Sequence, residues 1–264
     1  MTYPICRACG TQYDGPREDC PVCLDERQYV PQSGQRWTSL KELQAEGHSG
    51  RFEEQGPGVI GIGVTPEFSI GQRALLLRTP AGNVLWDCVP YLDDEMVRRV
   101  EELGGIDHIA ISHPHFYSTM VEWAHAFDAP VHLHEADREW VGRPDPALRF
   151  WSGRALELTD ELTLINPGVH FPGSTVLHSN AGEGSLFTGD VINVGPDPRW
   201  VSIMYSFPNH VPEQPQKVRI AADVLAGYRF DRLYGAWWDR VITTGAEEVL
   251  GRSVERYLRM ERGE

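Results

Sequence analysis

The segment that decides the fold runs from Ile106 to Ser118 and reads Ile-Asp-His-Ile-Ala-Ile-Ser-His-Pro-His-Phe-Tyr-Ser. Its first seven residues include Ile106 and the apolar triplet Ile109-Ala110-Ile111, which predicts a buried strand. Two histidines, His113 and His115, then stand two positions apart in the loop before a helix predicted over residues 118–127. Loops that leave the carboxyl ends of strands are where α/β proteins expose reactive groups. The segment therefore predicts an α/β fold whose paired imidazoles can chelate one metal ion.

Strands and helices alternate on both sides of this segment. Each half of the chain begins with strands joined by turns and continues with strand-helix units, so we expect two sheets packed face to face with helices outside. The predicted strands cover residues 58–64, 74–77, 83–86, 106–112, 131–134, 156–158, 162–165, 175–178, 185–188 and 232–235, and the predicted helices cover residues 93–103, 118–127, 217–225 and 246–262.

Two further motifs follow the histidine loop. They are Gly168-Val169-His170-Phe171-Pro172-Gly173-Ser174-Thr175 and Leu186-Phe187-Thr188-Gly189-Asp190. With these three pieces in order, the chain resembles the metallo-β-lactamase superfamily, whose members carry H-x-H-x-D-H, then G-x-H-x-x-G-S/H, then T-G-D. The resemblance covers about residues 58 to 240 and implies an αββα sandwich.

The resemblance also implies a set of site residues. Three histidines would bind the first metal, and a carboxylate would reach the metal or its water. A second aspartate, in Leu85-Trp86-Asp87, stands where the family often has a residue that orients the ligands. In this sequence the ligands are His113, His115, His170 and Asp190, and the orienting residue is Asp87.

The chain departs from the family pattern at the second metal. Tyr117 and Ser118 stand where the family has the aspartate and histidine that complete H-x-H-x-D-H. The late histidine is replaced by the stretch Tyr234-Gly235-Ala236-Trp237-Trp238-Asp239. We therefore predict one metal, with His210 as a candidate replacement for a lost ligand.

Three histidines and one carboxylate suit Zn²⁺ with an open position for water. The first function predicted is a mononuclear hydrolase in which metal-bound hydroxide attacks an ester, lactone, amide or phosphoester, with Asp190 positioning the nucleophile. Tyr117 either donates to an oxyanion or packs in the space of the second metal. A second predicted function is that of a mononuclear Fe²⁺ oxygenase or redox protein, similar to the sulfur dioxygenases that share the fold. A third is a binding protein with a degenerate, non-catalytic site.

Four cysteines near the N-terminus form two C-x2-C pairs, in Cys6-Arg7-Ala8-Cys9-Gly10 and Cys20-Pro21-Val22-Cys23. Two such turns place four thiolates around one tetrahedral ion. The segment resembles a zinc ribbon and the rubredoxin-like domains of rubrerythrins. We predict a structural Zn²⁺ here, with iron as the alternative, in a knuckle spanning residues 1–35 that is separate from a domain spanning residues 50–264.

Composition limits the partners. The 264 residues are 41% hydrophobic and carry a formal net charge of -14, which is typical of a globular protein without a basic nucleic-acid footprint. No apolar stretch reaches the roughly 20 residues that span a bilayer, and the N-terminus does not read as a secretory signal. We expect a cytoplasmic protein that acts on a small molecule and binds neither nucleic acid nor membrane. The sequence leaves the oligomeric state open, with the knuckle as a candidate homodimer contact.

Overall fold

The computed structural model describes residues 3–263, which divide into two compact units. Of the described residues, the first unit comprises 3–133 and 138–150, and the second comprises 134–137 and 151–263. Each unit contains one large sheet with helices, so the predicted α/β class is confirmed. The predicted division into a 1–35 knuckle and a 50–264 domain stays a prediction.

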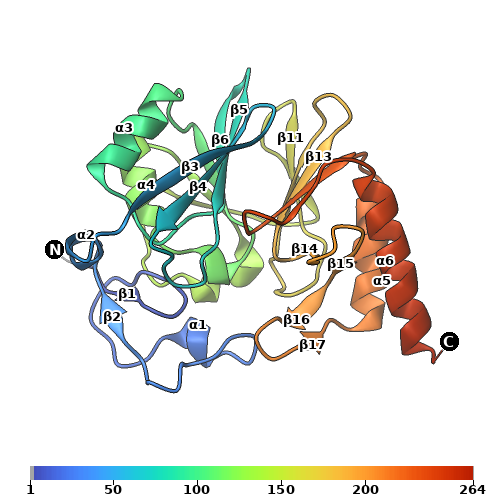
Figure 1. The fold of residues 1–264 in the computed structure, drawn as a ribbon, viewed down its shortest axis with the longest axis horizontal. Coiled ribbons are helices and arrows are strands. Elements are labelled where there is room, and N and C mark those ends of the chain that lie inside the picture. The colour runs from blue at the N-terminus through green and yellow to red at the C-terminus, as the bar shows by residue number, and fades with distance from the viewer. Residues whose placement is uncertain (1–2, 264) are drawn as a thin grey trace. The chain divides into compact units, whose positions relative to one another are not determined.

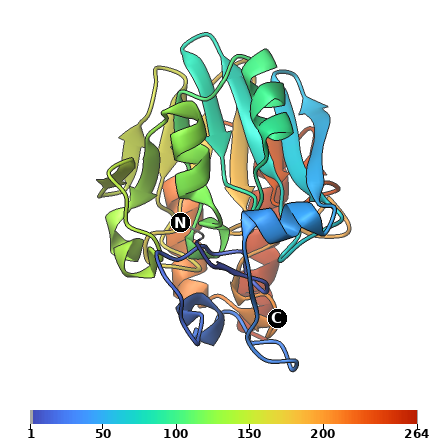
Figure 2. The ribbon, with the colours of Figure 1, turned by 90° about the vertical axis from the view of Figure 1, so that its left-hand side faces the viewer.

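The first unit is organised around a seven-stranded sheet (Figures 1 and 2). Its first four strands are antiparallel neighbours, whereas β6, β7 and β8 run parallel. Parallel strands need crossover connections, and the helices α3 and α4 supply two of them on the same face of the sheet. The elements are β3 (Ser49–Gly56), β4 (Val59–Thr65), β5 (Ala74–Thr79), β6 (Gly82–Trp86), α3 (Asp94–Glu102), β7 (His108–Ala110), α4 (Met120–Phe127), β8 (Val131–His134) and β9 (Leu148–Trp151).

The N-terminal segment also belongs to the first unit. It contains β1 (Ile5–Cys6), α1 (Pro21–Leu24), β2 (Trp37–Thr38) and α2 (Leu40–Ala45). The strands β1 and β2 pair antiparallel, which closes the cysteine segment into one loop. Two short 3-10 turns, η1 (Pro114–Phe116) and η2 (Glu135–Trp140), complete the elements before the second large sheet.

The second unit contains a six-stranded sheet in which only β13 and β18 pair parallel. Its helices α5 and α6 lie side by side in Figure 1 and bury an apolar face that includes Val218, Leu225 and Val249. The elements are β10 (Ala155–Glu157), β11 (Leu162–Ile165), β12 (Val176–Ser179), β13 (Ser185–Gly189), β14 (Asn193–Val194), β15 (Val201–Ser202), β16 (Met204–Ser206), β17 (Val211–Pro212), α5 (Pro215–Leu225), β18 (Arg232–Gly235), β19 (Val241–Ile242) and α6 (Ala246–Glu261).

The predicted helices and most predicted strands are present, with ends that differ by a few residues. The helix expected over residues 93–103 is α3, and Asp93 caps it by accepting a hydrogen bond from Met96 N at 2.8 Å. The edge strand β3 lies outside the predicted strands, because its mostly polar sequence lacks the apolar alternation that marks a half-buried strand. None of the helices in residues 3–263 has the length and apolar character required to cross a bilayer.

Candidate metal centres

The histidine loop begins where β7 ends. His113 has an extended backbone (φ -171°), and Pro114 then starts the 3-10 turn that contains His115. The two imidazole rings lie 5.0 Å apart between centroids at an interplanar angle of 76°. Both side chains are buried, with exposed fractions of 1% and 3%. The loop therefore presents two imidazoles from a rigid, dry turn.

Ser112 and Asp87 hold this loop through hydrogen bonds. Ser112 Oγ lies 2.9 Å from His113 Nδ1, so Nε2 is the atom left to face a ligand. Ser112 N donates to Asp87 Oδ1 at 2.7 Å, and Asp87 N donates to Ala110 O at 2.8 Å. Burial raises the pKa of Asp87 to about 7, against the lowering effect of its hydrogen bonds with Ser112. Asp87 thus holds the residue that precedes the first histidine.

His170 lies in the loop between β11 and β12. Its Nδ1 donates to the carbonyl oxygens of Met204 and Tyr205, both at 3.1 Å, which leaves Nε2 as the ligand atom. Its backbone N donates to Glu213 Oε2 at 2.7 Å. Glu213 could not be predicted from the sequence, because it stands 43 residues from His170 and belongs to no recognisable motif.

The remaining predicted residues of the histidine site are also buried. Asp190 directly follows β13, where Gly189 adopts a positive φ of 56°, and its exposed fraction is 5%. Thr188 Oγ1 donates to Ile192 O at 2.7 Å and so fixes the turn that carries Asp190. Tyr117 is 2% exposed and immediately follows the 3-10 turn.

Three histidines form a ligand group. One nitrogen each from His113, His115 and His170 lies within 4.8 Å of the other two. Three imidazole nitrogens are a donor set that a Zn²⁺ ion with one open position uses. The donor set therefore fits a metal such as zinc or iron.

Other histidines lie outside this group. His134 Nε2 contacts Gly153 O at 3.1 Å, and His178 Nε2 contacts Arg229 O at 2.8 Å. Both are therefore packed residues that hydrogen-bond to the backbone. His210, the candidate replacement ligand, is exposed in the turn between β16 and β17.

The four cysteines form a second ligand group. Cys6 Sγ lies 3.6 Å from Cys23 Sγ, and Cys9 Sγ lies 3.5 Å from Cys20 Sγ. These distances are far longer than the roughly 2.05 Å of a disulfide. They are close to the edge of about 3.8 Å in a tetrahedron with metal–sulfur bonds of about 2.3 Å. All four side chains are buried, so the cluster fits one tetrahedral ion.

Local backbone geometry explains the first cysteine turn. Gly10 N donates to Cys6 O at 2.8 Å, and Gly10 has a positive φ of 82°. A Cβ at this glycine would lie 2.7 Å from Pro90 Cβ, so both conformation and space favour glycine. Tyr13 OH at 3.2 Å from Cys20 Sγ and Gln35 Nε2 at 3.1 Å from Cys6 Sγ add polar contacts to the sulfurs.

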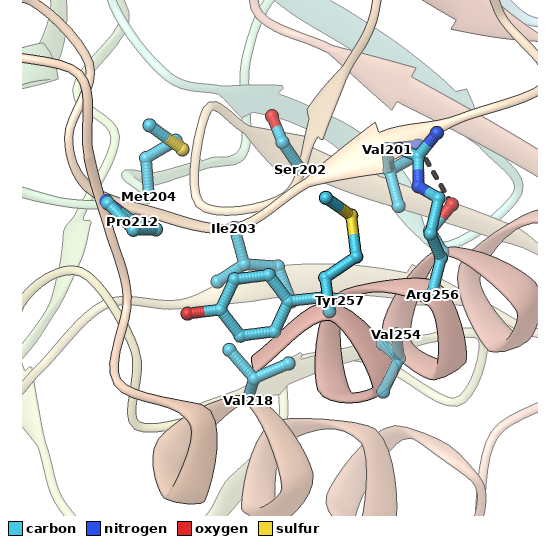
Figure 3. Close-up of a pocket in the computed structure, with 11 residues that line it drawn as sticks. Val201, Ser202, Ile203, Met204, Pro212, Val218, Val254, Arg256 and Tyr257 are labelled. Carbon is cyan, nitrogen blue, oxygen red and sulfur yellow. Dashed lines mark hydrogen bonds between the residues drawn. The ribbon is translucent and has the colours of Figure 1, made fainter. Parts of the chain in front are cut away.

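The second unit also contains an apolar groove along β15, β16 and α6 (Figure 3). Figure 3 shows Tyr257 and Val218 facing Ile203, with Arg256 at one end. None of the predicted site residues lines it. The groove is therefore distinct from the histidine site, although β16 also supplies a carbonyl that holds His170.

Comparisons with known proteins agree with this geometry. The family described as "Metallo-beta-lactamase superfamily" matches residues 71–237. The chain is 44% identical over 266 residues to "Uncharacterized protein YmaE" of Bacillus subtilis (strain 168). The alignment covers 98% of this chain and 97% of the relative.

Solved structures with a similar fold include two metallo-β-lactamases. DIM-1 is 13% identical with a TM-score of 0.60, covering 79% of this chain and 98% of DIM-1. FIM-1 from Pseudomonas aeruginosa, in its mono-zinc form, is 13% identical with a TM-score of 0.57, covering 79% of this chain and 96% of FIM-1. At such identities the likeness concerns the fold alone.

Proposed function

Since the chain belongs to the metallo-β-lactamase superfamily, we propose that it is a hydrolase that works with a single metal ion. Members of this superfamily are mostly metal-dependent hydrolases, and the scissile bond proposed here is that of an ester, lactone, amide or phosphoester. The observation that carries the proposal is the group of three buried histidines. The substrate is a small molecule.

His113, His115 and His170 are the proposed ligands. The hydrogen bonds to Nδ1 of His113 and of His170 orient each ring before any ion binds, which lowers the cost of assembling the site. A single ion is proposed because Tyr117 and Ser118 occupy the positions of two ligands of the family's second metal. The hydroxyls of Tyr117 and Ser118 do not substitute for the aspartate and histidine of the family motif, because a neutral hydroxyl is a poor metal ligand.

Bound by these histidines, Zn²⁺ would supply a water of lowered pKa as the nucleophile. The carboxylate of Asp190 would accept a hydrogen bond from that nucleophile and orient it for attack. The phenol of Tyr117 donates a hydrogen bond to the oxygen on which negative charge develops in the transition state. The burial of both side chains excludes bulk water, which strengthens these polar interactions.

The cysteine cluster is proposed to hold a second, structural Zn²⁺. Its four thiolates leave no open position, whereas a catalytic site needs one. The buried apolar cluster of this segment is small and consists of the four cysteines with Tyr13 and Val22, so metal binding would supply much of its folding free energy.

Elemental mass spectrometry on the full chain tests the metal assignment. We expect two metal ions per chain in the wild type, one in His113→Ala/His170→Ala, and two in the control His125→Ala. His125 is a fair control because it is exposed and paired with Asp145. Equal metal content in the double variant and the control would contradict the proposed ligands.

Hydrolysis of ester, lactone, amide and phosphoester probes then tests the reaction. We expect the double histidine variant to lose turnover and Tyr117→Phe to lower kcat by about 10²-fold, as the loss of one oxyanion donor does. Turnover that survives removal of the histidine-site metal would rule out a metal-dependent hydrolase. Iron in this site together with oxygen consumption would favour the oxygenase instead.

A further inference from the structure

The cysteine knuckle contacts the histidine loop directly. Gln12, which lies between the two cysteine pairs, donates its backbone N–H to Ser118 O at 3.1 Å. Ser118 follows Tyr117 and stands three positions after the ligand His115. The far end of the histidine loop is therefore tied to the metal-binding knuckle by a backbone hydrogen bond.

The side chain of Gln12 reinforces this contact. Its Nε2 donates to Glu122 Oε1 at 3.0 Å, and its Oε1 accepts from Arg143 Nη1 at 2.6 Å. Arg143 Nη1 also donates to Glu122 Oε1 at 2.6 Å, with the Arg143 side chain only 8% exposed. Glu122 lies in the first turn of α4, the helix that begins directly after the histidine loop. The side chains of Gln12, Arg143 and Glu122 thus connect the knuckle to α4.

The residue that follows Gln12 contacts the cysteine cluster. The next residue, Tyr13, is buried and places its hydroxyl 3.2 Å from Cys20 Sγ. The ring packs on Gly142 so closely that a Cβ there would lie 2.6 Å from it. Asp14 N also donates to Gly142 O at 3.1 Å. The segment Gln12–Asp14 is therefore held between the cysteine sulfurs and the body of the first unit.

Ser118 needs such support. Its φ of 46° lies in the left-handed region, which a non-glycine residue adopts only when its surroundings hold it there. Gln72 Nε2 donates to Ser118 Oγ at 3.0 Å, and Ser118 Oγ donates to Cys88 O at 3.3 Å. Ser118 also occupies the position at which the family motif has a ligand of the second metal. Here protein contacts, including one from the knuckle, hold this backbone.

We propose that the metal in the cysteine knuckle positions the histidine loop, with Gln12 as the positioning residue. Metal binding at the cysteines orders Gln12–Asp14, which holds Ser118 and thereby the turn that carries His113 and His115. The two metal sites are then coupled, so occupancy of the knuckle raises the affinity of the histidine site. This inference rests on the proposed histidine metal site.

The test compares Gln12→Ala with the control Glu18→Ala in the full chain carrying Zn²⁺ in the knuckle. Glu18 is an exposed residue of the same loop. Titration with Co²⁺ against a chromophoric chelator reports the affinity and the visible spectrum of the histidine site. We expect Gln12→Ala to weaken Co²⁺ binding by about 10-fold and to alter the spectrum, as loss of an outer contact does. Glu18→Ala should leave both unchanged.

Amide hydrogen exchange gives a readout that needs no metal at the histidines. We expect Gln12→Ala to speed exchange across residues 115–119 several-fold and removal of the knuckle metal to do so more strongly. If affinity, spectrum and exchange in Gln12→Ala all match those in Glu18→Ala, the coupling is wrong, even if Gln12→Ala lowers Tm. A wild type that binds no Co²⁺ outside the knuckle refutes the proposed function, and the exchange result then decides whether the knuckle positions the loop.

Discussion

Asp87, Ser118 and His170 adopt positive φ values of 62°, 46° and 66°, a region that costs free energy for residues other than glycine. All three belong to the histidine site or to the contacts that support it, and each is at most 3% exposed. Strain of this kind persists only where surrounding contacts over-determine the backbone, and it is often found at functional sites. At the residue scale, hydrogen bonds hold the backbone of Asp87, Ser118 and His170 in these conformations.

Asp87 should make stability depend on pH. Its pKa is about 7 in the folded protein and about 3.8 in the unfolded chain, so between these values the folded state binds a proton that the unfolded state has released. The free energy of unfolding should therefore fall as pH rises from about 4 to about 7, by up to about 4 kcal/mol. Asp87→Asn keeps the acceptor for Ser112 N and should remove this dependence.

Urea unfolding at pH 4.5 and pH 7.5 measures the effect in wild type, Asp87→Asn and the exposed control Asp160→Asn. All three proteins should receive the same chelator treatment, because a cation near Asp87 would oppose the rise in its pKa. An identical pH dependence in wild type and Asp87→Asn would show that Asp87 is ionised throughout this range.

At the scale of elements, the start of α5 is connected to the loop that carries His170. Gln214 stands at the N-cap position of α5, and its backbone N donates to Glu213 Oε1 at 2.8 Å, while Glu213 Oε2 accepts from His170 N. Glu213 N donates to Ile203 O at 3.1 Å, and the Tyr257 hydroxyl donates to Glu213 O. One buried carboxylate therefore joins a helix start and a ligand loop.

Glu213→Gln should weaken metal binding at the histidine site. The carboxylate accepts from two N–H groups with two oxygens, whereas the amide would direct its own N–H₂ at one of them. We expect affinity to fall by about 10 to 100-fold, with the knuckle metal retained. Competition with a chromophoric chelator measures this, and Glu248→Gln on the exposed side of α6 is the matched control. Equal affinities in the two variants would show that Glu213 does not position His170.

At the scale of the whole molecule, stability should depend on metal concentration. Any ion that binds only the folded state raises its stability by mass action, by about 2.7 kcal/mol at 100 times Kd. Stepwise addition of Zn²⁺ to the metal-depleted chain should therefore raise Tm. His113→Ala/His170→Ala should retain most of this increase, because the knuckle folds with its metal.

Differential scanning calorimetry with elemental analysis of the same samples checks this prediction. Cys9→Ser/Cys20→Ser is the complementary variant, and it should lose most of the Zn²⁺-dependent increase. A Tm that does not change when the cysteine metal is removed would mean that the knuckle is held by its packing alone.

The sequence by itself determined the features that depend on short windows. The cap Asp93 predicts the start of α3, because side-chain capping acts within one turn. The paired spacing of Cys6, Cys9, Cys20 and Cys23 predicts their cluster, because each C-x2-C turn directs two sulfurs to one centre. Apolar strands such as β18, expected over residues 232–235 and found at Arg232–Gly235, are also readable from local pattern.

Only the tertiary structure decided the contacts that support the site. Glu213 accepts from His170 N across 43 residues of sequence, and Gln12 N in the knuckle donates to Ser118 O, which is far from it in sequence. The edge strand β3 likewise exists because β4 offers it a hydrogen-bonding partner along its whole length. Local propensity carries no signal for such pairs, because their free energy is gained only after the intervening chain has folded and brought the two partners together.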